Sequence, residues 1–425
     1  MNETRWRAEL STIVSIMRDL SSQTEPQKAA NMYGQRLREA NLVPSDAYVA
    51  VSRRDLAAPA YRITRFSAWK EDINPWRQKD KLPLFTSGIL GDLLYSNEPA
   101  IIEDLRARLS KDDPAYGYLR GFNFLVTMPQ YDDGIAVNMG VILVRDGKDF
   151  PRERIPVMVW QANLWGRSVL NLVLKNQLRE AYDILDEELR TVGDMQKSLL
   201  PTELPNISTL DLAVHYETSR RAGGDYYDLF DLGEGRWGIL IADVSGHSTP
   251  AAVIMAITHA VAHLHPGNRK PAGQLLSFVN HHLASRYTTV PTTFVTAFYG
   301  VYDSAARTLT YARAGHNPPR HCRDGVATPL DEVGGLPLGI TPDESYDEHT
   351  VQLERGDALF FYTDGITEAR VASGEMFGTD PLDRALAACD GNARNLLAAL
   401  LKDLHAFTIG QPLQDDRTVL AAIVK

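Results

Sequence analysis

Apolar residues near the N-terminus recur at the spacing of an α-helix. They occupy every third or fourth position between residues 6 and 20, which is typical of one face of an amphipathic helix. A second helix is predicted from Pro26 to about Ala40, because proline is favoured in the first turn of a helix. The apolar positions of the first helix are Trp6, Leu10, Ile13, Val14, Met17 and Leu20.

The pattern then changes to short segments rich in β-branched and aromatic residues. Ala47–Ser52 and Tyr61–Trp69 are candidate strands. Phe122–Gln130 and Ile135–Val144 flank Asp132-Asp133-Gly134, and an Asp-Gly pair between two apolar segments predicts a β-hairpin. This order of helices and strands indicates an α+β fold for the first part of the chain.

Residues 167–192 contain neither glycine nor proline, so a long helix is predicted there, with Gly193 and Pro201 at its junction with the second half. Its apolar residues follow the heptad spacing of a coiled coil. Asn171 occupies a seam position, where a buried asparagine favours a coiled coil of two helices. A single helix packed on its own domain would also explain the stripe. We favour a parallel coiled-coil homodimer, because a solitary helix between two domains would expose these residues. The seam residues are Leu174, Leu178, Ala181, Leu185, Val192, Met195 and Leu199, with Glu188 as the polar interruption.

Composition and charge narrow the class of protein. A chain of 425 residues with 44% hydrophobic residues can form two or three globular domains. The net charge of -10 argues against nucleic acid or an anionic membrane as partner. Cys322 and Cys389 are the only cysteines, too few for a disulfide framework or a cysteine-based zinc site. With no long apolar stretch and no signal-peptide pattern, we expect a cytoplasmic protein without a membrane segment.

Aspartates in the second half stand beside apolar or glycine-rich segments, namely Asp225, Asp243, Asp364 and the pair Asp415 and Asp416. One such aspartate is commonplace, but several in one domain predict carboxylates that converge. Converging carboxylates are costly to bury unless they share cations, and oxygen ligands suit Mg²⁺ or Mn²⁺. Two such ions would activate a water molecule for hydrolysis of a phosphate ester.

The N-terminal part resembles a GAF domain in its order of elements and in three segments, Met128-Pro129, Gly140-Val-Ile-Leu and Asp149-Phe150-Pro151. The resemblance implies an α/β sensor domain over residues 1–165 that receives a small molecule or a protein signal. All eleven histidines and both cysteines lie at or after His215, which excludes histidine-ligated haem and a thioether-linked bilin there.

Trp69, Trp76 and Phe85 could line a ligand pocket in this domain, but aromatic residues at such spacings are more often part of a core. A packed signalling domain without a ligand is therefore the favoured interpretation, with cyclic nucleotides or other small organic molecules as the alternative.

The second half resembles the type 2C metal-dependent protein phosphatases (PPM family), in their bacterial SpoIIE-like and RsbU-like branch. The resemblance implies a β-sandwich flanked by helices and two Mn²⁺ or Mg²⁺ ions. We therefore expect a sensor domain (1–165), a coiled-coil linker (166–200) and a phosphatase domain (201–425). The matching segments are Gln196-Lys-Ser-Leu-Leu-Pro201, Gly223-Gly-Asp-Tyr-Tyr-Asp-Leu-Phe230, Ala242-Asp-Val-Ser-Gly-His247, Ala314-Gly-His-Asn-Pro-Pro319, Gly335-Leu-Pro-Leu-Gly339, Tyr362-Thr-Asp-Gly-Ile-Thr-Glu-Ala369 and Asp415-Asp-Arg-Thr418.

Carried over by motif, the resemblance implies that Asp243 bridges the two ions and that the Val244 carbonyl binds one of them. Asp225, Asp364 and Asp415 would complete the metal site directly or through water.

Several further residues have weaker signals. Asp416 is the alternative to Asp415 as a ligand. Arg220 could bind the substrate phosphate, because a guanidinium group matches phosphate oxygens, although a surface role fits equally. His247 either orients a metal-bound water or caps a helix. Ser248 stands where the family usually has glycine.

The remaining polar residues are expected to be structural. His316 should form hydrogen bonds in a turn. His259 and His263 are spaced as a helical pair, but without a carboxylate ligand in that helix we do not expect zinc. Asp228 and Asp231 are expected to be solvated or to lie in turns.

The sequence thus predicts a serine/threonine phosphoprotein phosphatase regulated by its N-terminal domain through the coiled coil. The resemblance implies a phosphorylated STAS-type anti-sigma factor antagonist as substrate in a partner-switching pathway. A degenerate phosphatase that acts as a phosphoprotein-binding scaffold is the alternative, disfavoured because all four aspartate motifs are present. The absence of a GxxxxGK[ST] loop leaves a kinase or cyclase unsupported.

Overall fold

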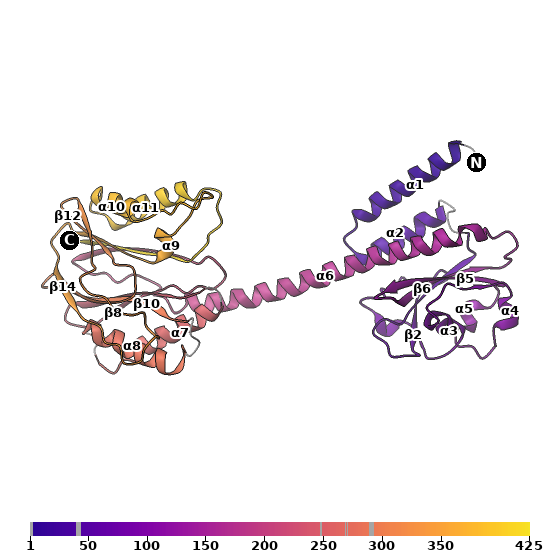
Figure 1. The fold of residues 1–425 in the computed structure, drawn as a ribbon, viewed down its shortest axis with the longest axis horizontal. Coiled ribbons are helices and arrows are strands. Elements are labelled where there is room, and N and C mark those ends of the chain that lie inside the picture. Colours follow the sequence, from indigo (N-terminus) through magenta and orange to yellow (C-terminus); the bar gives the residue numbers. More distant parts are fainter. Residues whose placement is uncertain (1–2, 40–43, 247–248, 268, 270, 289–292) are drawn as a thin grey trace. The chain divides into compact units, whose positions relative to one another are not determined.

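The computed structural model describes residues 3–39, 44–246, 249–267, 269, 271–288 and 293–425 (Figure 1). It divides the chain into two compact units, residues 1–182 and residues 183–425. The helix α6 (Ile155–Lys197) contributes residues to both units. Within the described residues, no helix combines the length and the apolar character needed to cross a bilayer.

The N-terminal unit is built on one antiparallel sheet with strand order β3-β2-β1-β6-β5-β4. The predicted hairpin is confirmed, because β5 and β6 pair from Phe124 and Val144 to Asp132 and Ile135. Both predicted earlier strands are also present, the second ending at Phe66. The strands are β1 (Ala47–Ser52), β2 (Tyr61–Phe66), β3 (Leu84–Phe85), β4 (Ile101–Ile102), β5 (Phe124–Asp132) and β6 (Ile135–Val144).

Helices cover both faces of this sheet (Figure 1). On one face lie α2 and the first part of α6, whose Tyr33 and Trp165 rings stack at 4.2 Å. On the other face, Leu90 and Leu105 of the short helices join a core with Val49 and Val141 of the sheet. This arrangement agrees with the order of elements that suggested a GAF domain, whose identity stays a prediction. The helices are α1 (Glu3–Ser21), α2 (Pro26–Glu39), α3 (Ile89–Tyr95), α4 (Leu105–Arg108) and α5 (Tyr116–Leu119), with 3-10 turns at η1 (Lys79–Lys81) and η2 (Arg152–Arg154).

The predicted long helix is confirmed, but its ends differ from the prediction. It begins at Ile155, before the expected linker, and Gly193 lies inside it rather than at its end. The seam is largely solvent-exposed: Leu178 is 58% exposed and Met195 is 65% exposed. Pairing of this stripe with a second copy of the chain stays a prediction.

The C-terminal unit contains two antiparallel five-stranded sheets with the orders β14-β11-β10-β9-β8 and β13-β12-β15-β16-β7. The strands of the first sheet are β8 (Tyr226–Asp231), β9 (Arg236–Val244), β10 (Val295–Asp303), β11 (Thr308–Ala314) and β14 (His349–Gln352). Those of the second sheet are β7 (Leu210–Glu217), β12 (Arg320–Arg323), β13 (Val326–Pro329), β15 (Ala358–Tyr362) and β16 (Arg417–Val424).

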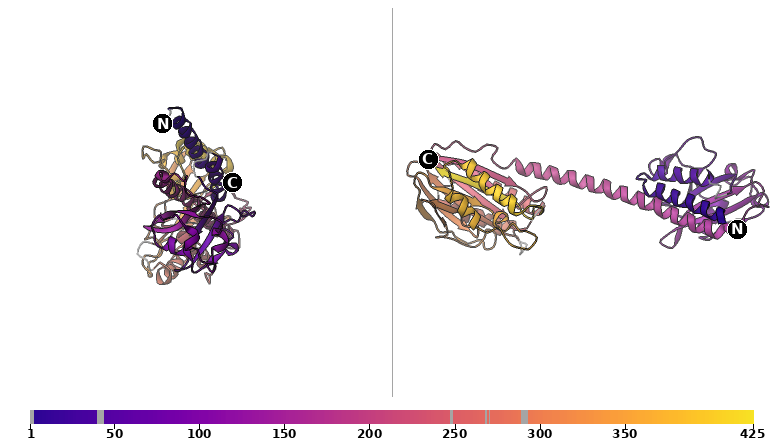
Figure 2. Two further views of the ribbon diagram at one scale, coloured as in Figure 1. Left: turned by 90° about the vertical axis from the view of Figure 1, so that its right-hand side faces the viewer. Right: turned by 90° about the horizontal axis from the view of Figure 1, so that it is seen from above.

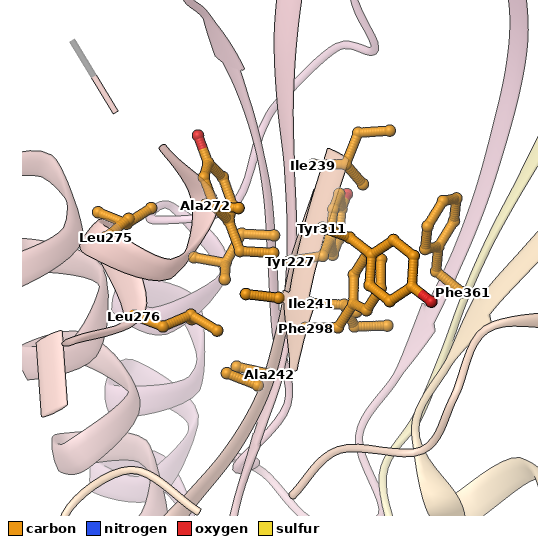
Figure 3. Close-up of a cluster of buried hydrophobic side chains, with 14 of the residues drawn as sticks. Tyr227, Ile239, Ile241, Ala242, Ala272, Leu275, Leu276, Phe298, Tyr311 and Phe361 are labelled. Carbon is orange, nitrogen blue, oxygen red and sulfur yellow. The ribbon is translucent and has the colours of Figure 1, made fainter. Parts of the chain in front are cut away.

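The two sheets pack face to face, as the Phe298 and Phe361 rings show at a centroid distance of 5.4 Å. Figure 3 shows these rings on one side of the first sheet and Leu275 and Leu276 of α8 on the other. Figure 2 shows α10 and α11 (yellow) lying over the second sheet. This is the helix-flanked sandwich predicted for the second half. Its helices are α7 (Thr249–His263), α8 (Ala272–Arg286), α9 (Asp364–Thr367), α10 (Asp380–Ala387) and α11 (Ala393–Phe407).

Candidate active site

Two of the predicted aspartates lie side by side at one end of the first sheet. Tyr226 of β8 pairs with Ala242 of β9, so the same antiparallel register places Asp225 opposite Asp243. Side chains alternate between the faces of a strand, and Tyr227, two residues from Asp225, packs toward Tyr216 of the second sheet. Asp225 therefore points into the space between the two sheets.

The second sheet holds Asp225 in place. The hydroxyl of Thr363 donates to its Oδ2 at 2.7 Å, and the hydroxyl of Thr418 donates to the same oxygen at 2.6 Å. Asp225 is 1% exposed, so these two donors replace the water that a carboxylate would otherwise bind. Both threonines lie within segments that match the phosphatase family. Their binding of Asp225, however, depends on a contact between the two sheets, which no local sequence pattern indicates.

The other two predicted aspartate segments reach the same place. Asp364 is the first residue of α9 and follows the buried strand β15 after one residue, Thr363, and the charge of Asp415 acts on it. Burial, followed by the charge of Asp415, raises the pKa of Asp364 to about 6. Burial also raises the pKa of Asp243, with the charges of Asp225, Asp364 and Asp415 adding to the effect. The four segments therefore converge, as predicted.

The structure separates the two neighbouring candidates Asp415 and Asp416. The carboxylate of Asp416 is buried and accepts hydrogen bonds from the Ser219 N–H at 2.7 Å and the Gly224 N–H at 2.6 Å. Asp415 is exposed, and its charge acts on Asp364 and Asp243. Asp416 thus fixes the loop that carries Asp225, and the role of Asp415 as a metal ligand stays a prediction.

The glycines before Asp225 are required by close packing. A Cβ atom on Gly223 would lie 2.1 Å from Asp416 Oδ2, and one on Gly224 would lie 2.7 Å from the Val244 carbonyl oxygen. Any side chain there would push the loop away from the aspartates. The Val244 carbonyl, a predicted ligand, therefore lies beside the Asp225 loop.

Arg220 lies at the edge of this site. It is exposed and follows Ser219, whose N–H binds Asp416. Its role in binding phosphate stays a prediction. His247 and Ser248 lie outside the described residues.

His316 forms a polar contact from the turn after β11, and its structural role stays a prediction. Its Nδ1 lies 2.8 Å from the hydroxyl of Thr296, and burial lowers its pKa to about 3, so the ring is neutral.

The expectation for Asp228 is wrong. Asp228 is 6% exposed, lies within β8 and contacts His263 at 2.7 Å. The helix that carries the two histidines contains no carboxylate, whereas the strand beside that helix provides one.

The donor set at the aspartate site fits hard divalent cations. Several carboxylates lie in a partly buried space where each raises the cost of ionising the others. Bound divalent ions would remove this repulsion, and Mg²⁺ or Mn²⁺ prefers such oxygen ligands.

The N-terminal unit contains a cavity of about 300 Å³ between the sheet and α6. Trp76 lines this cavity, which is one of the two roles considered for it from the sequence. Phe85 instead packs against the core on the other face of the sheet. Trp69 also packs against that core. Four cationic side chains reach the cavity, namely Arg54, Arg62, Arg65 and Lys79.

Comparisons with known proteins agree with this geometry. The SiaA-PP2C domain of Pseudomonas aeruginosa superposes with a TM-score of 0.51 at 20% identity, covering 58% of this chain and 99% of that domain. The C-terminal unit therefore has the fold of a PP2C domain. Residues 233–425 match the family described as Stage II sporulation protein E (SpoIIE).

Two curated proteins are similar in sequence. Phosphoserine phosphatase RsbU of Bacillus subtilis is 31% identical over 198 residues, which cover 46% of this chain and 58% of RsbU. Protein IcfG of Synechocystis sp. is 26% identical over 282 residues, covering 59% of this chain and 44% of IcfG. The chain thus spans about half the length of these relatives.

The raised pKa values predict how stability depends on pH. The ordinary pKa of an aspartate is about 3.9, so the folded protein holds more protons on Asp364 than the unfolded chain from about pH 4 through about pH 6. This contribution to stability is present below pH 4 and is lost as the pH rises through about 6. Metal-free Asp364→Asn protein should therefore lose less stability than wild type over this range, as measured by thermal unfolding in EDTA. Mn²⁺ should stabilise wild type more as the pH rises, because it binds the ionised carboxylates.

Asp231→Asn is the matched control, because Asp231 is exposed and lies at the end of β8, the strand that follows Asp225. Equal pH dependence in wild type and Asp364→Asn would contradict this account of the site.

Proposed function

We propose that this protein is a metal-dependent serine/threonine phosphoprotein phosphatase. The observation that carries the proposal is the convergence of Asp225, Asp243, Asp364 and Asp415 on one buried edge of a PP2C-type fold. Similarity to a phosphoserine phosphatase supports it.

The chain's own residues have distinct parts in this proposal. Asp243, Asp225, Asp364 and Asp415 hold two Mn²⁺ or Mg²⁺ ions together with the Val244 carbonyl. When bound, such ions supply an activated water and stabilise the charge on the phosphate. Thr363 and Thr418 orient Asp225 and favour its ionised form by donating to its Oδ2, against the burial that raises its pKa to about 8. Arg220, at the exposed rim, is proposed to contact the incoming phosphate.

The substrate class that we propose is a phosphorylated STAS-type protein in a partner-switching pathway. Similarity to RsbU supports this choice. The alternative is a scaffold that binds a phosphoprotein without hydrolysing it.

Replacing Asp243 tests the reaction directly. Asp243→Asn should lower the Mn²⁺-dependent hydrolysis of a phosphoserine peptide by at least about 100-fold, because even residues behind metal ligands typically contribute 10- to 100-fold. Asp231→Asn should hydrolyse the peptide at the wild-type rate. If wild type and Asp243→Asn both bind a phosphoprotein stoichiometrically and neither hydrolyses it, the scaffold alternative is correct.

We further propose that α6 regulates the site. The side-chain amide of Gln196 binds both backbone groups of Gly223: its Oε1 accepts from the N–H at 2.9 Å, and its Nε2 donates to the carbonyl at 2.6 Å. Asp186 of the same helix accepts two hydrogen bonds from Arg221 at 2.8 and 3.0 Å. Movement of α6 would therefore displace the loop that carries Asp225.

Gly193 permits this contact between helix and loop. A Cβ atom on Gly193 would lie 2.0 Å from the backbone oxygen of Arg221, so a side chain would force the two apart. In a free helix the change from glycine to alanine stabilises by about 1 kcal/mol. A loss of function in Gly193→Ala therefore cannot come from weakened helix formation.

Upstream, the exposed seam is proposed to pair with that of a second copy of the chain as a parallel coiled coil. Pairing would bury Leu174, Leu178 and Leu185, which are half or more exposed. A signal in the N-terminal unit could then change the pairing and, through α6, the position of Asp225.

Two variants test this regulation. Leu178→Lys should shift the protein from dimer to monomer in analytical ultracentrifugation, because a charge would be buried in the seam. Both Leu178→Lys and Gly193→Ala should change the Mn²⁺-dependent phosphatase rate by about tenfold or more, a coupling of about 1.4 kcal/mol.

The controls are Asp183→Lys, on the face of α6 opposite the seam, and Gly117→Ala, where a Cβ atom would meet nothing within 4 Å. Unchanged rates in both test variants, or the same change in the controls, would refute the coupling.

The cavity in the N-terminal unit is our proposed site for a small anionic organic ligand. Two of the four cationic side chains at this cavity have acidic partners, because Arg54 pairs with Asp132 and Lys79 pairs with Asp55. The Nε of Arg62 is buried and has no hydrogen-bond partner within the described part of the chain. An anion would supply the missing acceptor.

Cyclic nucleotides provide a first test of this ligand site. At least one of cyclic AMP, cyclic GMP and cyclic CMP should raise the thermal unfolding temperature of wild type, and its neutral nucleoside should not. The increase should be lost in Arg62→Met and kept in Arg77→Met, whose side chain is exposed. Equal stabilisation by the nucleosides, or none by any cyclic nucleotide, would count against an anionic ligand of this class.

A further inference from the structure

A second group of metal-binding side chains lies in the C-terminal unit, apart from the aspartate site. It consists of Asp228, His259 and His263. Each offers one ligand atom, and the three atoms lie within 4.8 Å of one another. Two come from α7 and one from β8, so the group exists only in the folded chain.

Strand geometry separates this group from the aspartate site. Asp225 and Asp228 are three residues apart, so they point to opposite faces of the first sheet at a spacing of roughly 10 Å along the chain. Asp225 binds threonines of the second sheet, whereas Asp228 faces α7, where it contacts His263. Tyr226, on the same face as Asp228, packs edge-on against His259.

The spacing of the ligand atoms fits a tetrahedral ion. Bonds of about 2.0–2.1 Å to nitrogen and oxygen place neighbouring ligand atoms roughly 3.3 Å apart. Asp228 Oδ2 lies 2.7 Å from His263 Nε2 and 3.8 Å from His259 Nδ1, which brackets this value. Two imidazoles and one carboxylate are ligands that Zn²⁺ accepts, with a fourth position left for water.

The surroundings also favour a cation. His259 and His263 lie in the last turns of α7, where the helix dipole presents its negative end. Burial, followed by the charge of His263, lowers the pKa of His259, which favours the neutral ring that binds metal. The phenol oxygen of Tyr226 lies 2.5 Å from Asp228 Oδ2 and 3.1 Å from His259 Nδ1, the same two atoms that would bind the ion, so the phenol would give up these contacts when the ion binds.

One nearby group opposes a cation. Arg269 lies over the ring of Phe230 at 5.0 Å. Its guanidinium donates to the carbonyl oxygens of Ala262 and His263, which partly compensate its charge. Asp228 remains available as the anionic ligand at the cluster.

We propose that Asp228, His259 and His263 form a site for a single Zn²⁺ ion that fastens α7 to the edge strand β8. β8 begins directly after Asp225, and α7 begins shortly after Asp243. The ion would thus link the two elements whose ends carry neighbouring aspartates of the proposed active site. Zn²⁺ binding here does not depend on phosphatase activity, so the two proposals can fail separately.

Calorimetric titration of the full chain with Zn²⁺ tests the site. The protein is first stripped with EDTA and then kept in excess Mg²⁺, which occupies oxygen-only sites. Wild type and Asp243→Asn should each bind one Zn²⁺ ion under these conditions. His263→Ala and His259→Gln should each weaken this binding by about tenfold or more, because loss of a direct ligand costs at least as much as loss of a residue behind one.

His405→Ala provides the matched control, because His405 is an exposed helical histidine in α11. The variant should bind Zn²⁺ as wild type does. Co²⁺ in place of Zn²⁺ gives a second measurement: the visible absorption of a tetrahedral site should be present in wild type and Asp243→Asn and absent in His263→Ala. Circular dichroism in EDTA should show that both histidine variants fold as wild type does.

Three results would overturn the proposal. The first is the absence of Zn²⁺ binding to the Mg²⁺-loaded wild type. The second is binding that disappears in Asp243→Asn but persists in both histidine variants, which would place the ion at the aspartate site. The third is equal weakening by His405→Ala, which would indicate adventitious binding to surface histidines.

Discussion

The aspartate carboxylates at one end of the first sheet repel one another, and the arrangement of the residues around them in the C-terminal unit depends on this repulsion. Burial and neighbouring charges raise the pKa of Asp243, and the same combination acts on Asp225 and Asp364. Bringing these carboxylates together does not stabilise the fold, because each of them loses bound water and is repelled by the charges of the others. The arrangement makes physical sense as a site for cations, and the surrounding residues serve to hold the carboxylates where cations can bind.

The supporting contacts come from the second sheet, the residues beside it and α6. Thr363 and Thr418 reach Asp225 from the second sheet, and Asp416 fixes the preceding loop through two backbone N–H groups. Gln196 of α6 binds the same loop from outside the sandwich. The position of Asp225 therefore depends on three separate parts of the C-terminal unit. This dependence gives the long helix a physical route to the proposed active site.

The first sheet has different chemistry on its two faces, although Asp225 and Asp228 lie only three residues apart. Alternation along β8 directs Asp225 inward to the oxygen-rich site and Asp228 outward to the histidines of α7. Oxygen ligands on the inner face suit hard ions, and the mixed nitrogen and oxygen ligands on the outer face suit Zn²⁺. The two sites would thus differ in the ions they select.

Local pattern in the sequence was enough to predict the hairpin, the long helix and aspartate segments that converge. These features depend on periodicity, turn residues and motifs that lie close together along the chain. The sandwich of two sheets was expected only from the resemblance of the second half to a known family. Tertiary structure decided what depends on contacts between distant segments. It distinguished Asp415 from Asp416, because only folding brings Ser219 and Gly224 to the second carboxylate. It also placed Asp228 beside His259 and His263, whose own helix contains no carboxylate. Contact between a helix and a strand produces no repeating pattern in either segment, so the sequence alone does not indicate it.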